Sequence, residues 1–503
     1  MKKQIIVFII LLLSFFTTNI FLAYSETPSV EWSLHKNEDG SRPNGYEQQM
    51  LWLINRARKN PQQEGIWLAS LDDPDVQRAC QYFHVDLDLL KREFASYSAK
   101  PPAAFDIRLF NAALAHSNDL IARDAQDHTG QIERVQNAGF HYVRLRGNVF
   151  SYGKSVIYSH AAFNIDWGND GNDGSGMQDG RGHRQAIMSL DGEYTNTGIA
   201  IVEENDASTD VGPLVVTQNF AEAYTAYSNH FNRFLVGTVW NDANNNAQYD
   251  PGEGVGDITI TPNNGTYFAI SGSAGGYSIP ILEDGDYEIT FSGDTLPYDI
   301  KRIIHIGSQS ILFDLIINKA GRFADVSQNY WAFQEIEKLY ESQITSGCGN
   351  WNFCPLDYVT RAQLAVFLEK CIYGADYSPP LATGNIFNDV SSAYWAASWI
   401  EQLYKDGITS GCGNGNFCPN NTVTRDQMAV LLLRSKYGSD YLPPSATGLI
   451  FNDISKNHWA AAWIEQLYHE NITSGCGNGN FCPNNTVTRD QMAVFLVRTF
   501  GLN

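Results

Sequence analysis

The last third of the chain repeats one sequence pattern three times. Phe323, Phe387 and Phe451 recur with a period of 64 residues. The same period relates other residues: Trp331, Trp395 and Trp459; Cys348, Cys412 and Cys476; and Arg361, Arg425 and Arg489. A fixed period of this length indicates one structural unit copied in tandem. The sequence therefore predicts three modules of common design: residues 321–384, 385–448 and 449–503.

Each copy reads FxD(V/I), then (Y/H)WA, an apolar stretch of helical period, a turn SGCGNxNFCP, and VTRxQ(L/M)AV at the start of a second helix. These motifs resemble those of the S-layer homology (SLH) family, whose modules anchor bacterial surface proteins to the cell wall. The resemblance implies a mainly α-helical bundle with pseudo-threefold symmetry. It also implies that grooves between the modules bind an acidic envelope or cell-wall polysaccharide.

One arginine per module is the candidate glycan contact: Arg361, Arg425 and Arg489. A guanidinium can hold a carboxylate through two parallel hydrogen bonds. The alternative is that each arginine only opens its helix and pairs with a neighbouring aspartate. The glutamate that the family carries two residues later is a glutamine in all three copies. The three repeated tryptophans are expected to anchor the cores of their modules; the alternative is that an exposed edge of each ring stacks on sugar.

Six of the eight cysteines fall in three Cys-x5-Cys pairs, one per module: Cys348 and Cys354, Cys412 and Cys418, Cys476 and Cys482. Exported proteins meet oxidising conditions, so each pair is expected to form a disulfide across its turn. Zinc binding is the alternative, although the spacing differs from a short zinc knuckle and no histidine or second pair stands nearby. Cys80 and Cys371 are expected to be small buried apolar side chains.

The first residues predict export. Lys2 and Lys3 precede the apolar run IIVFIILLL, and residues 23–25 offer a small-residue cleavage site, so residues 1–25 are predicted to be a signal peptide. No later stretch has the ~18 uninterrupted apolar residues of a membrane-spanning helix, so the mature chain is expected to lack one. A net charge of −21 argues against nucleic acid as a partner. The predicted product is a secreted, extracellular protein of a bacterial cell surface, S-layer or envelope.

Residues 26–45 are expected to be a linker. Residues 233–318 contain short apolar strands separated by Gly, Asn and Asp, which predicts an all-β sandwich. Within it, residues 242–253 read DANNNAQYDPGE. Oxygen ligands stand at positions 1, 3, 5, 7, 9 and 12 of this loop: Asp242, Asn244, Asn246, Gln248 (by its carbonyl), Asp250 and Glu253.

This spacing is that of an EF-hand-like calcium loop, and a structural calcium ion is expected there. The segment also resembles the B-type, prealbumin-like repeats of bacterial adhesins. The alternative is a polar hairpin loop without a metal. Ala247 favours that alternative, because it stands at position 6, where the sharp turn of a calcium loop prefers glycine.

Residues 46–226 mix helical and strand patterns. The segments LAHSNDLIARDAQDHTG, GNVFSYG, HAAFNIDWG, GRGHRQAIM and VTQNFAEAY occur in this order. They resemble the CAP superfamily in its bacterial, SCP-like form, which implies an α-β-α sandwich with a cleft lined by two histidines and two acids. The resemblance places His128, His183 and Asp166 in that cleft. Gly147 stands where the family has its second acid, a glutamate.

The cleft leaves several functions open. Two histidines and one aspartate could bind a divalent metal and activate water, as in a metal-assisted, protease-like hydrolase. The missing acid favours binding and display instead of catalysis. The resemblance also implies a lipid or sterol carrier, so a lipid or protein ligand is a further alternative. His116 and His160 are expected to be ordinary hydrogen-bonded histidines. The whole chain is predicted to be a multidomain α+β protein in which the SLH modules bind the envelope and a β-sandwich spaces the CAP domain from it.

Overall fold

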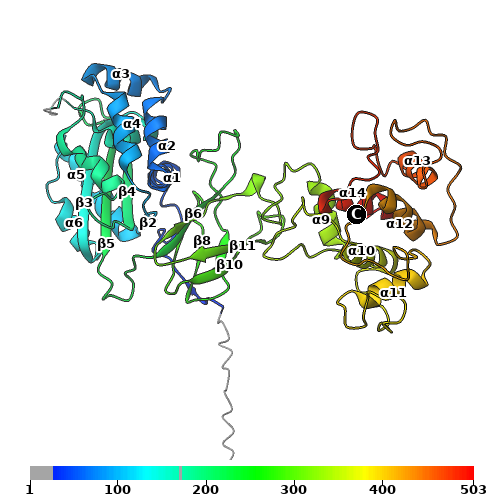
Figure 1. Ribbon diagram of the computed structural model, residues 1–503. Helices are drawn as coiled ribbons and strands as arrows, with labels where there is room; N and C mark the ends of the chain where they lie inside the picture. Colours follow the sequence, from blue (N-terminus) through cyan, green and yellow to red (C-terminus); the bar gives the residue numbers. More distant parts are fainter. Residues whose placement is uncertain (1–26, 169–172, 503) are drawn as a thin grey trace, which may run out of the picture.

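The computed structural model describes residues 27–168 and 173–502, so the expected signal peptide at residues 1–25 lies outside the described residues. Three regions follow one another along the chain in Figure 1: a helix-and-sheet region in blue and cyan, a β region in green, and a helical region in yellow to red. The protein is therefore a multidomain molecule of mixed α and β structure. No helix among the described residues is both long and apolar enough to cross a membrane.

The first region is a four-stranded sheet with helices on both faces (Figure 1). Its strand order is β2-β4-β5-β3, in which β2 and β4 are parallel and the other pairs antiparallel. The strands are β2 (Ala104–Phe105), β3 (Tyr142–Gly153), β4 (Asn196–Glu203) and β5 (Leu214–Ala223). The helices are α1 (Gly45–Lys59), α2 (Pro61–Ala69), α3 (Pro74–Phe83), α4 (Leu87–Ser96), α5 (Ile107–Arg123), α6 (Gln131–Asn137), α7 (Val156–Ala161) and α8 (Gly182–Ile187).

Local sequence explains where α1 begins and ends. Asn44 and Glu47 form a capping box, in which the Asn44 side chain accepts from the Glu47 N–H at 3.0 Å and the Glu47 carboxylate accepts from the Asn44 N–H at 2.8 Å. Met50 and Ile54, four residues apart on one helix face, are fully buried. Pro61 cannot continue the helix and instead starts α2 at its first position.

The second region consists of two sheets. One has the order β1-β8-β7-β10-β11, and in the other β6 lies between β12, β13 and β9. The strands are β1 (Val30–Glu31), β6 (Phe234–Trp240), β7 (Thr259–Pro262), β8 (Tyr267–Ile270), β9 (Gly276–Pro280), β10 (Gly285–Ser292), β11 (Ile300–Ile306), β12 (Ile311–Leu312) and β13 (Leu315–Ile316). Tyr287, Ile289 and Phe291 alternate with more exposed residues along β10, so one face of the strand fills the core between the sheets.

Part of the segment expected to be a linker, residues 26–45, belongs to the β region. Val30 pairs with Tyr267 in a parallel bridge, so β1 forms the edge of the larger sheet of the β region. Trp32 is buried against the rings of Phe231 and Tyr267, at centroid distances of 5.4 and 5.5 Å. A run of only two strand residues is too short to be recognised from periodicity.

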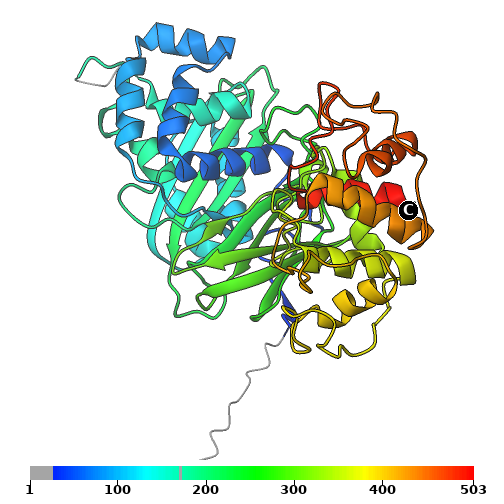
Figure 2. The ribbon, with the colours of Figure 1, turned by 45° about the vertical axis from the view of Figure 1, so that its right-hand side comes forward.

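The third region is a bundle of six helices: α9 (Phe333–Glu341), α10 (Arg361–Tyr373), α11 (Ala397–Lys405), α12 (Arg425–Tyr437), α13 (Ala461–His469) and α14 (Arg489–Phe500). The three longer helices, α10, α12 and α14, pack against one another. Each shorter helix packs on the long helix of the preceding module: α11 on α10, α13 on α12, and α9 on α14. Figures 1 and 2 show α11 and α13 at opposite outer ends of the bundle.

The bundle is closed by a cycle of backbone hydrogen bonds. Val423 N–H donates to the Val359 carbonyl at 3.0 Å, Val487 N–H to the Val423 carbonyl at 2.9 Å, and Val359 N–H to the Val487 carbonyl at 3.0 Å. The third module therefore returns to the first, and the three copies are related by a pseudo-threefold arrangement.

Disulfides join the predicted cysteine pairs, with Cα–Cα distances of 6.0 to 6.1 Å: Cys348–Cys354, Cys412–Cys418 and Cys476–Cys482. This confirms the disulfide prediction. The other two cysteines, Cys80 and Cys371, are half-buried against apolar cores, and burial raises the pKa of their thiols to about 11 and about 12.

Candidate functional site

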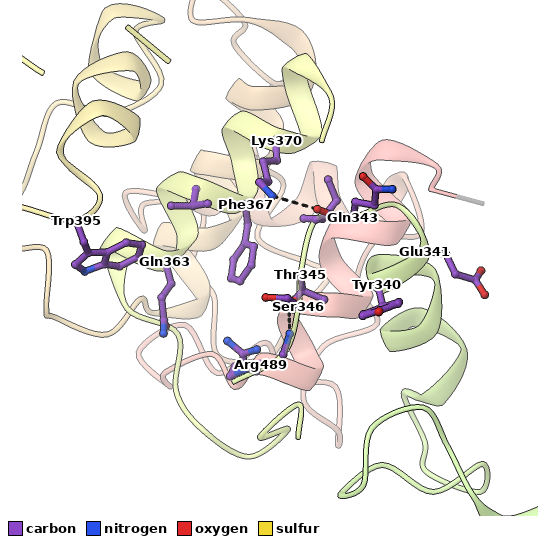
Figure 3. Close-up of a pocket in the computed structure, with 13 residues that line it drawn as sticks. Tyr340, Glu341, Gln343, Thr345, Ser346, Gln363, Phe367, Lys370, Trp395 and Arg489 are labelled. Atoms are coloured by element: carbon purple, nitrogen blue, oxygen red, sulfur yellow. Dashed lines mark hydrogen bonds between the residues drawn. The ribbon is translucent and has the colours of Figure 1, made fainter. Parts of the chain in front are cut away.

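A groove of about 530 Å³ opens between the modules of the helical bundle. We call it the first groove. It is lined by residues 340–341 and 343–347, by one face of α10 that includes Phe367 and Lys370, by Trp395 of the second module and by Arg489 of the third. In the view of Figure 3, Lys370 and Arg489 lie at opposite ends of this groove, with Phe367 between them. The pseudo-threefold closure is thus what brings all three modules to one site.

Arg489 presents a buried cation to the first groove. Its side chain is 4% exposed, its Nε donates to the Phe353 carbonyl at 2.7 Å, and the guanidinium lies 4.8 Å from the centre of the Phe353 ring. Its Nη2 has no hydrogen-bond partner among the described residues. Burial lowers the pKa of Arg489, and nearby Asp357 and Asp325 oppose this shift. A desolvated guanidinium with a free nitrogen is suited to an anionic ligand.

Lys370 supplies a second positive charge. Its ammonium group donates to the Gln343 carbonyl at 3.2 Å and forms no ion pair within residues 173–502. Glu341 also borders the first groove, but its carboxylate lies 3.6 Å from the guanidinium of Arg322. The first groove therefore carries two cations, and its one acidic side chain is already paired.

The three repeated tryptophans do not anchor the module cores, so that prediction is wrong. Trp331, Trp395 and Trp459 are 59%, 62% and 59% exposed. The module cores are instead filled by Phe323, Phe387 and Phe451 and by aliphatic side chains of the helices. An exposed indole face can stack on the apolar face of a sugar ring.

The three predicted arginines occupy equivalent joints between modules. Each Nε donates to the backbone carbonyl of a phenylalanine in another module: Arg361 to Phe417 at 2.7 Å, Arg425 to Phe481 at 2.8 Å and Arg489 to Phe353 at 2.7 Å. Each arginine is the first residue of its helix, as the alternative expected, but none of the three forms an ion pair with an aspartate among the described residues. The Nε hydrogen bonds join each module to another module. Of the three arginines, only Arg489 lines the first groove.

In the first region, His183 and Asp166 lie together as the resemblance implies. Asp166 ends a π-helical turn (Ala162–Asp166) and is 1% exposed. One carboxylate oxygen lies 2.7 Å from His183 Nδ1, and the other accepts from the His183 N–H at 3.1 Å. These two bonds fix the orientation of the imidazole, and its other nitrogen has no hydrogen-bond partner within residues 27–168 and 173–502, so that it could act on a ligand.

His128 has a different partner that the sequence did not reveal. Its Nδ1 lies 2.7 Å from the Gln131 amide oxygen, and Gln131 in turn donates to Asn219 at 2.9 Å. A Cβ atom at Gly147 would stand 2.3 to 2.5 Å from the Gln131 side chain. Gln131 thus fills the space that a glutamate at position 147 would need. Its spacing of three residues from His128 was the only available signal.

His116 and His160 each form a hydrogen bond to a protein oxygen, as predicted. His116 Nε2 lies 3.0 Å from the Asp127 carbonyl, and His160 Nε2 lies 2.9 Å from the Glu64 carboxylate. Both histidines are fully buried, and burial lowers the pKa of each.

In the predicted calcium loop, the side chains of Asn244, Asn246 and Asp250 lie together. One Asp250 oxygen accepts from the amides of both Asn244 and Asn246 at 2.8 Å. Asp242 is fully buried, and its Oδ1 meets no hydrogen-bond donor in the described chain. Ala247 adopts a φ of +59°, the left-handed conformation that a sharp calcium-loop turn requires. Lys319 forms an ion pair with the other Asp242 oxygen, and that hydrogen bond lowers the pKa of Asp242.

A protein-family model for the S-layer homology domain matches the chain three times, at residues 322–365, 386–429 and 450–493. An endoglucanase from Bacillus sp. (strain KSM-635) is 33% identical over 34% of this chain and 18% of its own length. The S-layer protein sap from Bacillus anthracis is 28% identical over 35% of this chain and 21% of its own length. Cell surface glycoprotein 1 from Acetivibrio thermocellus is 30% identical over 30% of this chain and 7% of its own length.

These matches cover less than a quarter of each relative. Among solved structures, an extracellular SCP-domain protein from Bacillus anthracis str. Ames aligns with 30% of this chain and 44% of its own, at 17% identity and a TM-score of 0.19. A similarity that low carries no argument about the first region. The chain contains three S-layer homology domains, and it is a protein of the bacterial cell surface or envelope.

Proposed function

We propose that the three SLH domains hold this protein at the bacterial envelope by binding a carboxylate-bearing wall polysaccharide in the first groove. The observation that carries the proposal is the buried guanidinium of Arg489, a residue that lines the groove and whose Nη2 has no hydrogen-bond partner in the described part of the chain. A buried donor without an acceptor is unfavourable, and a sugar carboxylate would satisfy it. Lys370 adds charge, and the exposed face of Trp395 adds a stacking surface.

The test is co-sedimentation of the full chain with purified bacterial wall fragments. Three preparations are compared: intact fragments, fragments stripped of polysaccharide, and fragments whose carboxyl groups are reduced to alcohols. The expected result is binding to the first preparation only, weakening as salt is added. Equal binding to carboxyl-reduced fragments would contradict the role of the cations.

For the first region, the favoured proposal is binding and display of a CAP-like domain. It is supported by the replacement of a carboxylate at His128 by the amide of Gln131, which cannot take up a proton or carry a negative charge. The rival is a hydrolase that uses the oriented His183–Asp166 pair. Peptide-library hydrolysis by the full chain, with and without added zinc, separates the two. Turnover that disappears in a His183→Ala variant would establish the rival.

For the loop at residues 242–253, we retain calcium as a structural ligand. The fit rests on the buried Asp242 oxygen without a donor and on the left-handed Ala247. Bound calcium would connect Asp242, Asp250 and neighbouring oxygens and so reduce their mutual repulsion. Calorimetry of the full chain should show a higher melting temperature in calcium than in chelator, and Asp242→Asn should abolish the difference. If the parent protein melts at the same temperature in calcium and in chelator, the loop does not bind a stabilising calcium ion.

A further inference from the structure

The three modules differ at the residue that follows the repeated arginine. It is Ala362 in the first module, and Asp426 and Asp490 in the others. The Asp426 carboxylate accepts from the Trp459 indole N–H at 2.9 Å, and Asp490 accepts from the Trp331 indole N–H at 3.0 Å. Ala362 offers no such acceptor, and the Trp395 indole N–H has no hydrogen-bond partner among the described residues.

The two aspartates are also fixed in place by the start of their helices. Asp426 is 5% exposed, and its other oxygen accepts from the Gln427 N–H at 2.8 Å and from the Thr424 hydroxyl at 2.5 Å. Asp490 is 3% exposed and makes the equivalent bonds. In the first module a capping box bonds the N–H groups at the start of the helix instead. The Gln363 side-chain oxygen accepts from the Thr360 N–H at 3.0 Å, and the Thr360 hydroxyl accepts from the Gln363 N–H at 3.2 Å. The first module thus caps its helix without a negative charge.

The basic residue on the third turn of each long helix also differs between the modules in its partners. The 64-residue period relates Lys370 to Arg434 and Arg498. Arg434 lies 5.5 Å from the ring centre of Trp463, and Arg498 lies 3.8 Å from a Glu335 oxygen. Lys370, in contrast, has no carboxylate partner within residues 173–502. Only the first of the three positions combines a free cation, a free indole N–H and the absence of a fixed carboxylate.

We infer that the first groove alone binds the acidic sugar, and that Asp426 and Asp490 exclude an anion from the two corresponding positions. The inference rests on the proposed function and narrows it to one site per chain. Each aspartate places a fixed like charge beside the ligand carboxylate and already occupies the indole N–H that a sugar oxygen would use. At the other two positions the repeated arginines join modules. Arg425 also has an Nη2 without a hydrogen-bond partner among the described residues, but its position holds the Asp490 carboxylate, which repels an anion.

The test is calorimetric titration of the full chain with size-fractionated acidic oligosaccharides released from bacterial wall. The parent should bind one oligosaccharide per chain. Ala362→Asp should weaken binding on the order of tenfold or more through the added like charge. Ala362→Asn is the matched control, because its amide can accept from Trp395 without a charge, and it should weaken binding less. The structure accommodates aspartate at both equivalent positions, so the variant is expected to fold, and its melting temperature checks this.

The converse variant, Asp426→Ala with Asp490→Ala, should raise the number of oligosaccharides bound above one per chain. Three sites in the parent, or unchanged affinity in Ala362→Asp, would overturn the inference and leave the proposed function standing. If the parent binds none of the acidic oligosaccharides, both the proposed function and this inference fail. If both position-362 variants weaken binding equally, the effect is steric and the charge argument is wrong.

Discussion

At the scale of single residues, Glu369 is a buried acid of the bundle whose two carboxylate oxygens both lack a hydrogen-bond partner among the described residues. Its position in α10 corresponds to Leu433 and Val497 in the other modules, and its side chain is fully buried. Burial, together with the nearby Asp406 carboxylate, raises the pKa of Glu369 to about 8. The group is therefore protonated in the folded protein at neutral pH.

This predicts a pH-dependent stability. The folded pKa is above the unfolded value of 4.5, so the favourable contribution is complete below pH 4.5 and is lost as the pH rises to about 8. Across that window, from pH 4.5 to about 8, the free energy of unfolding should fall by about 5 kcal/mol. Glu369→Leu, which copies the second module, should remove this fall. Urea unfolding of both proteins at pH 5 and pH 8.5 measures it, and parallel behaviour of parent and variant would contradict the assignment.

Ala247 gives a second prediction at this scale. An alanine at φ +59° is strained, whereas glycine adopts this conformation freely. Ala247→Gly should therefore raise the free energy of unfolding by about 0.5 kcal/mol, after allowing for the more flexible unfolded chain. Ala243→Gly is the matched control, because Ala243 has no left-handed backbone, and it should destabilise. Thermal melts in chelator compare the two, and a loss of stability in both variants would show that position 247 is not strained.

At the scale of elements, each disulfide turn is held in two ways. In the second module, the Asp389 carboxylate accepts from the Phe417 and Cys418 N–H groups, both at 2.7 Å, beside the Cys412–Cys418 disulfide. Replacing both cysteines by serine should lower stability by about 2 kcal/mol, because the unfolded chain gains freedom, while the Asp389 bonds keep the turn folded. Chemical unfolding under non-reducing conditions measures the loss. No difference between parent and variant would mean that the turn does not depend on the disulfide.

The sequence predicted a structural element correctly where residues close together in the chain determine that element. The 64-residue period gave the number of modules, and paired cysteines gave the disulfides, because both depend on local spacing. The exposure of Trp331, Trp395 and Trp459 was not predictable, because apolar character does not tell which side of a module a side chain faces. Gln131 was missed for a similar reason: only the folded chain places it in the space beside Gly147, and no sequence pattern marks that contact.

At the scale of the whole molecule, the three regions contact one another in sequence. Trp52 of α1 lies 6.2 Å from Trp240 of β6, and Gln48 donates to Thr238 at 2.9 Å, so the first two regions share a core. The bundle meets the β region through Trp351, whose indole N–H donates to Glu288 at 2.7 Å. The β region therefore joins the helical bundle to the first region through packed contacts on both sides.

The central claim, that the first groove attaches this molecule to the envelope, is tested most directly by one matched pair of variants. Lys370→Ala removes a cation from the groove, and Lys436→Ala removes a cation of α12 that lies outside it and pairs with Glu470 at 2.8 Å. Co-sedimentation of the full chain with wall fragments should weaken about fivefold for Lys370→Ala, as expected for the loss of about 1 kcal/mol, and remain at the parent level for Lys436→Ala. Equal binding by all three proteins would contradict the claim.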